Sequence, residues 1–146
     1  MLSSTAAPTR GKLSVTVVEA KDLKKEDVVG HNDVYVEAWL NKNYKQKTGT
    51  HENTSSPIWN ETLMFPVEKG DKDNKLYIRV LDKDMADSDK IGEGKLDISN
   101  LYKEGASPID EWISLPTHFH LSDKGKVHLK VEFVPENESA RATQHQ

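Results

Sequence analysis

Hydrophobic and polar residues alternate along most of the chain, which is the pattern of β-strands that bury one face. In the first such run, Leu13, Val15 and Val17 share one face, whereas Ser14 and Thr16 share the other. Turns rich in Gly, Pro, Asn and Asp separate the later runs. The expected strands are 12–20, 33–40, 44–48, 58–65, 75–81, 91–98, 112–115 and 127–133, with a short helix around 99–103.

This succession of short strands predicts an all-β fold, an eight-stranded antiparallel sandwich of two sheets. A chain of 146 residues is long enough for one full core and too short for two ordinary domains. We expect residues 1–10 to be a disordered tail, residues 11–134 to be the sandwich domain and residues 135–146 to be a second disordered, polar tail. The loops of a sandwich gather at its two ends, so functional groups are expected there.

Composition and motifs then argue against several classes of function. The net charge of −4 argues against nucleic-acid binding, and the absence of cysteine excludes disulfides and thiolate metal sites. No apolar run approaches the ~20 residues that span a bilayer, and residues 1–10 carry no hydrophobic secretory segment, so we expect a cytoplasmic protein. Neither a nucleophile elbow nor a phosphate-binding loop is present, and we expect no enzyme activity.

The clearest chemical signal is an acidic stretch that directly follows the run 75–81, with four carboxylates in the eight positions 82–89. Asp82 and Asp84 stand two residues apart where a strand ends, so they leave on the same face, and the following turn can bring Asp89 back towards them. Converging carboxylates repel one another unless a cation lies between them, and calcium prefers six to eight oxygen ligands. A solvated acidic turn explains the same residues without a metal.

A helix–loop–helix calcium site does not fit this stretch. Asp82, Asp84 and Glu93 fall on positions one, three and twelve of that motif, but Asp87 stands where the motif needs glycine. The flanking residues alternate as strands do. A loop between strands therefore needs acidic partners from elsewhere in the chain.

A second acidic loop lies in segment 23–35, where Asp27 and Asp33 stand six residues apart in the pattern Leu-x-x-x-Asp-x-x-Gly-x-Asn-Asp-x-Tyr. This pattern resembles the first calcium loop of the C2 domain family. Segment 53–61, Asn-Thr-Ser-Ser-Pro-Ile-Trp-Asn-Glu, is similar to a second motif of that family, and Asp82-x-Asp84 through Asp89-x-Ile91-Gly92 is similar to a third. The chain also resembles protein kinase C and small stand-alone C2-domain proteins.

The resemblance implies a calcium site at which main-chain carbonyls help the carboxylates. The implied ligands are Asp27, Asp33, Asp82, Asp84 and Asp89, with the backbone carbonyls of Glu26 and Lys83. The third loop is one residue shorter than in synaptotagmin-like members, so Asp87 is an alternative to Asp89 as the last ligand. A strand near the C-terminal end and none before Gly11 imply the circularly permuted, type II topology of the family.

The function implied by the resemblance is calcium-dependent binding of anionic phospholipid membranes, phosphatidylserine among them, with a membrane-targeting or adaptor role in signalling or trafficking. We expect a monomer that calcium recruits from the cytoplasm to the membrane. At the loop tips, Val28, Val29, Met85 and Ala86 are expected to enter the headgroup region, or else to pack one loop against the other. The alternative function is a calcium-independent protein-interaction module on the same fold.

Lys42, Lys45 and Lys47 form a second candidate surface. Segment 45–48, Lys-Gln-Lys-Thr, is identical to a segment of the conventional protein kinase C type, in which the lysines bind phosphoinositide headgroups. Lysines at alternate positions of one strand share a face, as such a site requires. A solvated edge strand kept soluble by lysine explains them equally well.

Overall fold

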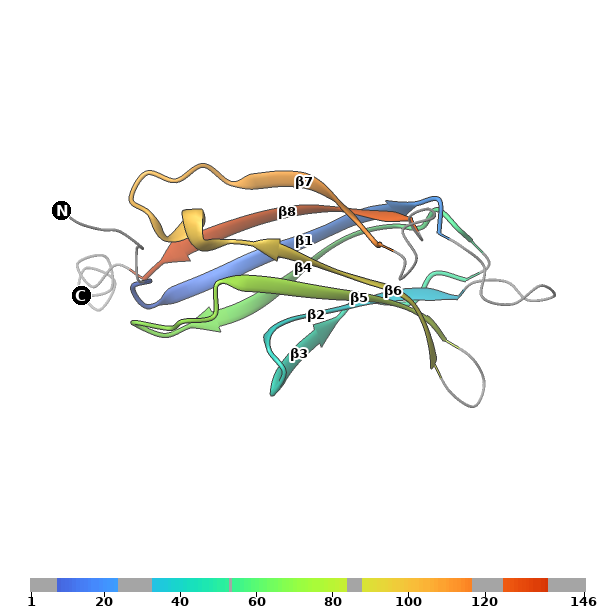
Figure 1. Ribbon diagram of the computed structural model, residues 1–146, viewed down its shortest axis with the longest axis horizontal. Helices are drawn as coiled ribbons and strands as arrows, with labels where there is room; N and C mark the ends of the chain where they lie inside the picture. Colours follow the sequence, from blue (N-terminus) through green and yellow to red (C-terminus); the bar gives the residue numbers. More distant parts are fainter. Residues whose placement is uncertain (1–7, 24–32, 53, 84–87, 117–124, 137–146) are drawn as a thin grey trace, which may run out of the picture.

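The computed structural model describes residues 8–23, 33–52, 54–83, 88–116 and 125–136. These described residues form eight β-strands and one 3-10 helix (Figure 1). The strands are β1 (Gly11–Lys21), β2 (Val34–Asn41), β3 (Tyr44–Lys47), β4 (Ile58–Val67), β5 (Lys75–Lys83), β6 (Ser88–Asp97), β7 (Ile109–Ser114) and β8 (Lys126–Pro135), and the helix is η1 (Ser99–Tyr102).

The strands pair into two four-stranded sheets, in the orders β4-β1-β8-β7 and β3-β2-β5-β6, and every neighbouring pair is antiparallel. The predicted sandwich is therefore confirmed. The last strand, β8, lies between β1 and β7 and pairs with β1 along its length, from Gly11 opposite Pro135 to Lys21 opposite Lys126. A C-terminal strand beside the first strand is the permuted order that the sequence predicts.

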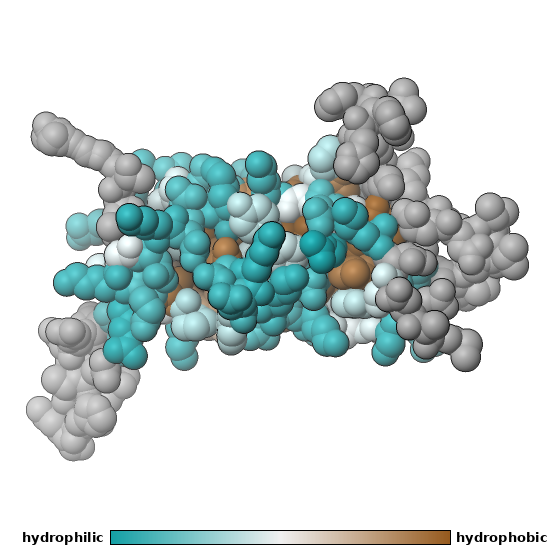
Figure 2. Space-filling model, turned by 60° about the horizontal axis from the view of Figure 1, so that its bottom comes forward, coloured by the Kyte–Doolittle hydropathy of each residue, from teal (hydrophilic) through white to brown (hydrophobic). Residues whose placement is uncertain are grey.

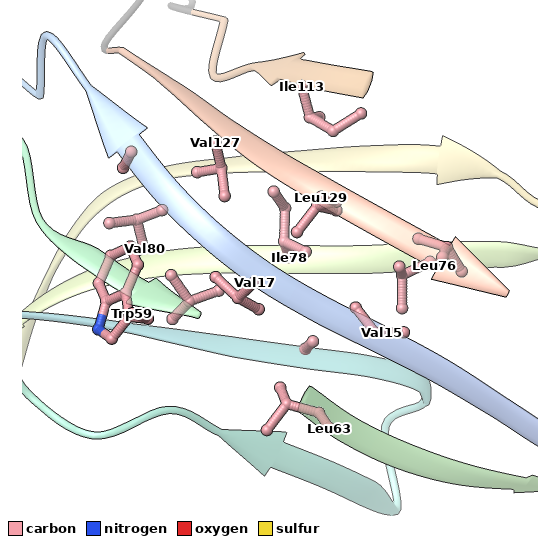
Figure 3. Packing of buried hydrophobic residues seen from close by; sticks show 14 of the residues in the cluster. Val15, Val17, Trp59, Leu63, Leu76, Ile78, Val80, Ile113, Val127 and Leu129 are labelled. Atoms are coloured by element: carbon pink, nitrogen blue, oxygen red, sulfur yellow. The ribbon is translucent and has the colours of Figure 1, made fainter. Parts of the chain in front are cut away.

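Alternating residues of both sheets meet between the layers. Val15 and Val17 of β1 and Leu129 of β8 are fully buried, and they face Ile78 and Val80 of β5 (Figure 3). Burial of apolar surface contributes about 25 cal/mol per Å², so this shared core holds the two sheets together. The periodicity of two thus places the inward residues where the sequence predicts them.

Several element boundaries differ from the prediction, and the largest differences are at the beginnings of two strands. Strand β7 begins at Ile109 rather than Trp112, β6 begins at Ser88 rather than Ile91, and the expected helix is a single 3-10 turn. In the described sheets β7 pairs only with β8 and β6 only with β5, so each is an edge strand. Edge strands tolerate polar residues such as Asp110, and these hide the alternation that marks a strand in the sequence.

Trp39 lies on the outer face of the second sheet, as the alternation predicts, yet it is buried. The ring of Tyr77 stacks on it at a centroid distance of 5.9 Å, and the cationic groups of Lys45 and Arg79 lie 4.6 and 5.1 Å from the centre of its ring. Polar side chains therefore cover an aromatic layer on this face. Seen from the side of β2 and β3, the surface is mainly hydrophilic (Figure 2).

Candidate functional site

One end of the sandwich is tied together by backbone hydrogen bonds between segments far apart in the chain. The N–H of Ala20, near the end of β1, donates to the carbonyl of Pro57 at 2.9 Å, and the N–H of Leu23 donates to the carbonyl of Ser55 at 3.3 Å. His51 and Val34 exchange two further bonds of 2.8 and 2.9 Å. Residues before β4 therefore join the end of β1 to the beginning of β2, because Ser55 and Pro57 bind the first and His51 binds the second. This end of the sandwich is at the right of Figure 1.

Asp33 and Asp82 meet at this end. The N–H of Asp33 donates to Oδ1 of Asp82 at 2.8 Å, and the N–H of Lys83 donates to the carbonyl of Asp33 at 2.7 Å. The register continues this contact, because Val34 of β2 stands opposite Asp82 of β5. The last residue before β2 and the end of β5 are therefore in direct contact, although the two aspartates are 49 residues apart in sequence.

The carboxylate of Asp82 lies in a protected position, since the residue is only 9% exposed. A carboxylate with so little solvent needs hydrogen-bond donors or a cation to offset its desolvation. The Cα atom of Asp89 is paired with that of Asp82 in the β5–β6 ladder. One residue earlier, Ser88 accepts a 3.0 Å hydrogen bond from the hydroxyl of Tyr35, which joins β6 to β2.

Lys83, whose carbonyl is a predicted ligand, is the last residue of β5, but four other predicted ligands fall outside the described residues. These are Asp27, Asp84 and Asp87 and the carbonyl of Glu26, and the predicted tip residues Val28, Val29, Met85 and Ala86 lie outside as well. Only the backbone of Asp89 is described. Within the described ranges, no group of three or more His, Asp or Glu side chains is close enough to hold a metal ion.

Asp33 and Asp82 nevertheless fit a hard cation. Both offer carboxylate oxygens, which are the ligands that calcium prefers, and calcium takes six to eight of them in loose geometry. Two carboxylates alone are too few. A calcium ion at this position would need further oxygens, which the segments 24–32 and 84–87, the carbonyl of Lys83 and the side chain of Asp89 would supply.

The predicted lysine surface is partly neutralised. The Nζ atom of Lys45 lies 3.8 Å from Oε1 of Glu37 and over the ring of Trp39, and the Nζ atom of Lys47 lies 5.9 Å from the ring centre of Tyr35. Lys42 occupies the exposed turn between β2 and β3. Lys45 and Lys47 lie over the rings of Trp39 and Tyr35 on the outer face of the sheet. The carboxylate of Glu37, which lies close to Lys45, also lies close to Arg79.

The motif in segment 53–61 has a structural role that the sequence prediction did not assign. The indole N–H of Trp59 donates to the carbonyl of Gly49 at 2.9 Å, and the carboxylate of Glu61 accepts from the N–H of the same glycine at 3.1 Å. Asn60 adopts a left-handed φ of 51°. These contacts hold Gly49 against β4, two residues before His51, which pairs with Val34 at the end where Asp33 and Asp82 meet.

Two described groups with clearly shifted pKa values lie at the opposite end of the sandwich. Burial raises the pKa of Tyr102 to about 12, and the nearby Asp71 and Asp73 add to this shift. The hydroxyl and N–H of Ser99 hold the pKa of the Asp97 carboxyl well below its usual range, and Lys75 contributes as well. Local hydrogen bonds and burial explain both shifts, so neither marks a catalytic centre.

The sequence prediction missed one cluster at the end where Asp33 and Asp82 meet. Trp112 of β7 is exposed there, with Lys21 and Lys126 over its ring. The alternation along β7 and β8 places Trp112 on the outer face. Only the pairing of β7 with β8 and of β8 with β1 brings the lysines to it.

Two four-stranded antiparallel sheets, with Asp33 and Asp82 in contact at one end, define a β-sandwich of the C2 type. The model of the C2 domain family matches residues 11–115. The chain belongs to the C2 domain family. Among the described residues, no helix is long and apolar enough to span a bilayer.

Similar proteins include a "Calcium-dependent lipid-binding protein" of Arabidopsis thaliana, 36% identical over 101 residues, which cover 68% of this chain and 19% of that protein. "Synaptotagmin-4" of Arabidopsis thaliana is 38% identical over 122 residues, which cover 83% of this chain and 21% of that protein. The chain thus spans about a fifth of the length of these relatives. A solved, calcium-bound structure of two C2 domains of Extended-Synaptotagmin 2 superposes with a TM-score of 0.72 and 26% identity, covering 88% of this chain and 47% of that one.

Proposed function

We propose that this protein is a non-catalytic, calcium-dependent binder of anionic phospholipid membranes. The observation that carries the proposal is the contact between Asp33 and Asp82, which draws the two acidic segments together at one end of the sandwich. A relative with calcium-dependent lipid binding in its name, and a calcium-bound structure with the same fold, support it.

The proposed ligands are the carboxylates of Asp27, Asp33, Asp82, Asp84 and Asp89, with Asp87 as the alternative to Asp89, and the carbonyls of Glu26 and Lys83. Calcium bound there would cancel a negative charge that repels anionic lipid and would offer coordination positions to headgroup oxygens. The protein's own part is to hold the carboxylates close. The hydrogen bonds from Asp33 to Asp82 and from Tyr35 to Ser88 fix the ends of β2, β5 and β6 for this purpose.

The cytoplasmic leaflet carries a negative surface potential, which attracts basic groups near it by about 1 kcal/mol each and fades within a Debye length of about 8 Å. We therefore propose a monomer that resides in the cytoplasm and moves to this leaflet when calcium rises. Val28, Val29, Met85 and Ala86 are the proposed apolar tips that enter the headgroup region. Lys42 and Lys47 are the remaining candidates for a phosphoinositide contact, since Lys45 is close to Glu37.

One observation favours a second candidate, a calcium-independent protein-interaction module. Asp82 already accepts the N–H of Asp33, so the two segments are held together by a hydrogen bond that needs no cation. Such an end could present a fixed surface to a protein partner at any calcium concentration. The two candidate functions differ in whether binding of the partner depends on calcium.

Sedimentation with phosphatidylserine vesicles separates them. The protein is expected to pellet with these vesicles in calcium, to stay in the supernatant with chelator, and to ignore vesicles of phosphatidylcholine alone. Equal pelleting with calcium and with chelator would contradict the calcium-dependent function and favour the alternative.

A further inference from the structure

A cluster of aromatic and basic residues lies on the outer face of the sheet β4-β1-β8-β7, away from the lysines of β3. Its centre is Trp112, which is 37% exposed. The Nζ atoms of Lys21 and Lys126 lie 4.8 and 5.5 Å from the centre of its ring, and the ring of His128 stacks on it at 4.9 Å. We refer to Trp112, Lys21, Lys126 and His128 as the Trp112 cluster.

The indole is held in place rather than loosely exposed. His128 stands opposite Trp112 in the β7–β8 ladder, and its ring lies nearly parallel to the indole, at 22°. The imidazole Nε2 is also hydrogen-bonded to the carboxylate of Asp110, two residues before Trp112 on the same strand. Because Asp110 fixes the imidazole and the imidazole supports the indole, the exposed surface of Trp112 is preorganised.

The two lysines are an unusual pair for a sheet. Lys21 and Lys126 stand directly opposite each other in the β1–β8 ladder, where like charges destabilise the pairing. Within the described ranges, neither ammonium has a carboxylate at ion-pair distance, whereas Lys45, Arg79 and Lys90 on the other sheet all do. The aromatic ring supplies part of the compensation through cation–π attraction. A polyanion would supply the rest.

The Trp112 cluster lies at the same end as the contact between Asp33 and Asp82. Lys21 is the last residue of β1, one residue after Ala20, whose N–H binds the carbonyl of Pro57. Lys126 is the first residue of β8 and directly follows Gly125, which accepts from the N–H of Leu115. A membrane that meets the acidic loops therefore lies within reach of this face.

We propose that the Trp112 cluster is a second contact with the anionic bilayer, so that the domain docks with the β4-β1-β8-β7 face inclined towards the membrane. This inference rests on the proposed function. Tryptophan prefers the membrane–water interface, where its ring is apolar on one side and its N–H meets water. The ammonium groups of Lys21 and Lys126 then lie at the level of the lipid phosphates, which provide the missing negative charge.

The chain supplies its own reporter for this contact. It has three tryptophans, all in described segments, and Trp39 and Trp59 are buried whereas Trp112 is exposed. With vesicles of phosphatidylserine and brominated phosphatidylcholine, the emission of the full chain is expected to shift to the blue and to be quenched. Trp112→Phe should remove this change, because the two buried tryptophans have little access to lipid.

Lys21→Ala with Lys126→Ala should lower the affinity for these vesicles about thirtyfold, given about 1 kcal/mol for each of the two basic residues at the surface. The matched control is Lys12→Ala with Lys130→Ala, exposed lysines on the same two strands. Lys130 lies about 13 Å farther from that end than Lys126, and Lys12 about 30 Å farther than Lys21, at ~3.3 Å per residue. The control should change the affinity less than about twofold, because both lie beyond a Debye length.

Each assay is run with calcium at moderate salt and with chelator at low salt. Protein that pellets in calcium without a change in emission would overturn the second contact and leave the proposed function standing. Equal losses in the two double variants would overturn it as well, since they would indicate bulk charge alone. An emission change that requires Lys21 and Lys126 but ignores calcium would support the second contact while contradicting the calcium dependence. A response to polyglutamate but to no vesicle, or no response at all, would overturn it.

Discussion

Replacing Asp82 with Asn is expected to abolish the calcium-induced rise in melting temperature. A ligand that binds only the folded state stabilises it by about 2.7 kcal/mol at a hundredfold excess over its dissociation constant, and the variant should lose this gain. The amide oxygen of Asn can still accept the N–H of Asp33, so the contact between β2 and β5 survives while the negative charge is removed. Thermal unfolding with calcium and with chelator measures the effect.

The matched control is Asp73→Asn, which removes an equal charge from the turn before β5, at the opposite end of the sandwich. This variant should keep the full calcium response. If the Asp82 variant responds to calcium as strongly as the wild type does, Asp82 is not a ligand and the assignment of the site is wrong.

Truncation of Phe65 to Ala is expected to lower the free energy of unfolding by about 3–5 kcal/mol, because it removes a large buried ring and leaves a cavity. Phe65 is 1% exposed, and its ring meets that of Tyr44 edge to face at 6.0 Å. Unfolding in urea measures the loss. Phe65 pairs with Leu13 near the beginning of β1, far from the contact between Asp33 and Asp82, so calcium should still add its usual stabilisation.

Met64→Ala is the neighbouring control, since Met64 is 41% exposed on the opposite face of β4. It should change the free energy of unfolding by less than about 0.5 kcal/mol. Comparable losses for the two variants would contradict the assignment of inward and outward faces in β4.

The sequence predicts most of the fold because alternation is a local property. Val15 and Val17 face the core since a strand sends every second side chain to the same side. The same rule does not predict the burial of a residue on the outer face of a sheet. Trp39 is buried on the outer face because Tyr77, Lys45 and Arg79 cover it, and this cover depends on strand pairing.

The candidate site is only partly predictable for the same reason. The sequence indicates two acidic segments, and its resemblance to the C2 domain family implies that their carboxylates lie together. The spacing of 49 residues between Asp33 and Asp82 carries no information about their contact until β2 is paired with β5. The Trp112 cluster needs three strands in register, β7, β8 and β1, and so no single segment could reveal it.

The two lysine surfaces lie on opposite sheets and imply different docking orientations. Lys45 on β3 lies close to Glu37 and covers Trp39, whereas Lys21 and Lys126 meet only an aromatic ring among the described residues. Ion pairing reduces the charge that a lysine can offer to a phosphate. The electrostatics of the described residues therefore favour the side of β1 and β8.

The central claim is that two separate acidic segments combine their carboxylates to bind calcium. A crystal structure determined in excess calcium tests it most directly. We predict electron density for at least one ion that is coordinated by carboxylate oxygens of both Asp33 and Asp82, at about 2.3–2.6 Å. Well-ordered Asp33 and Asp82 side chains with no ion between them would contradict the claim.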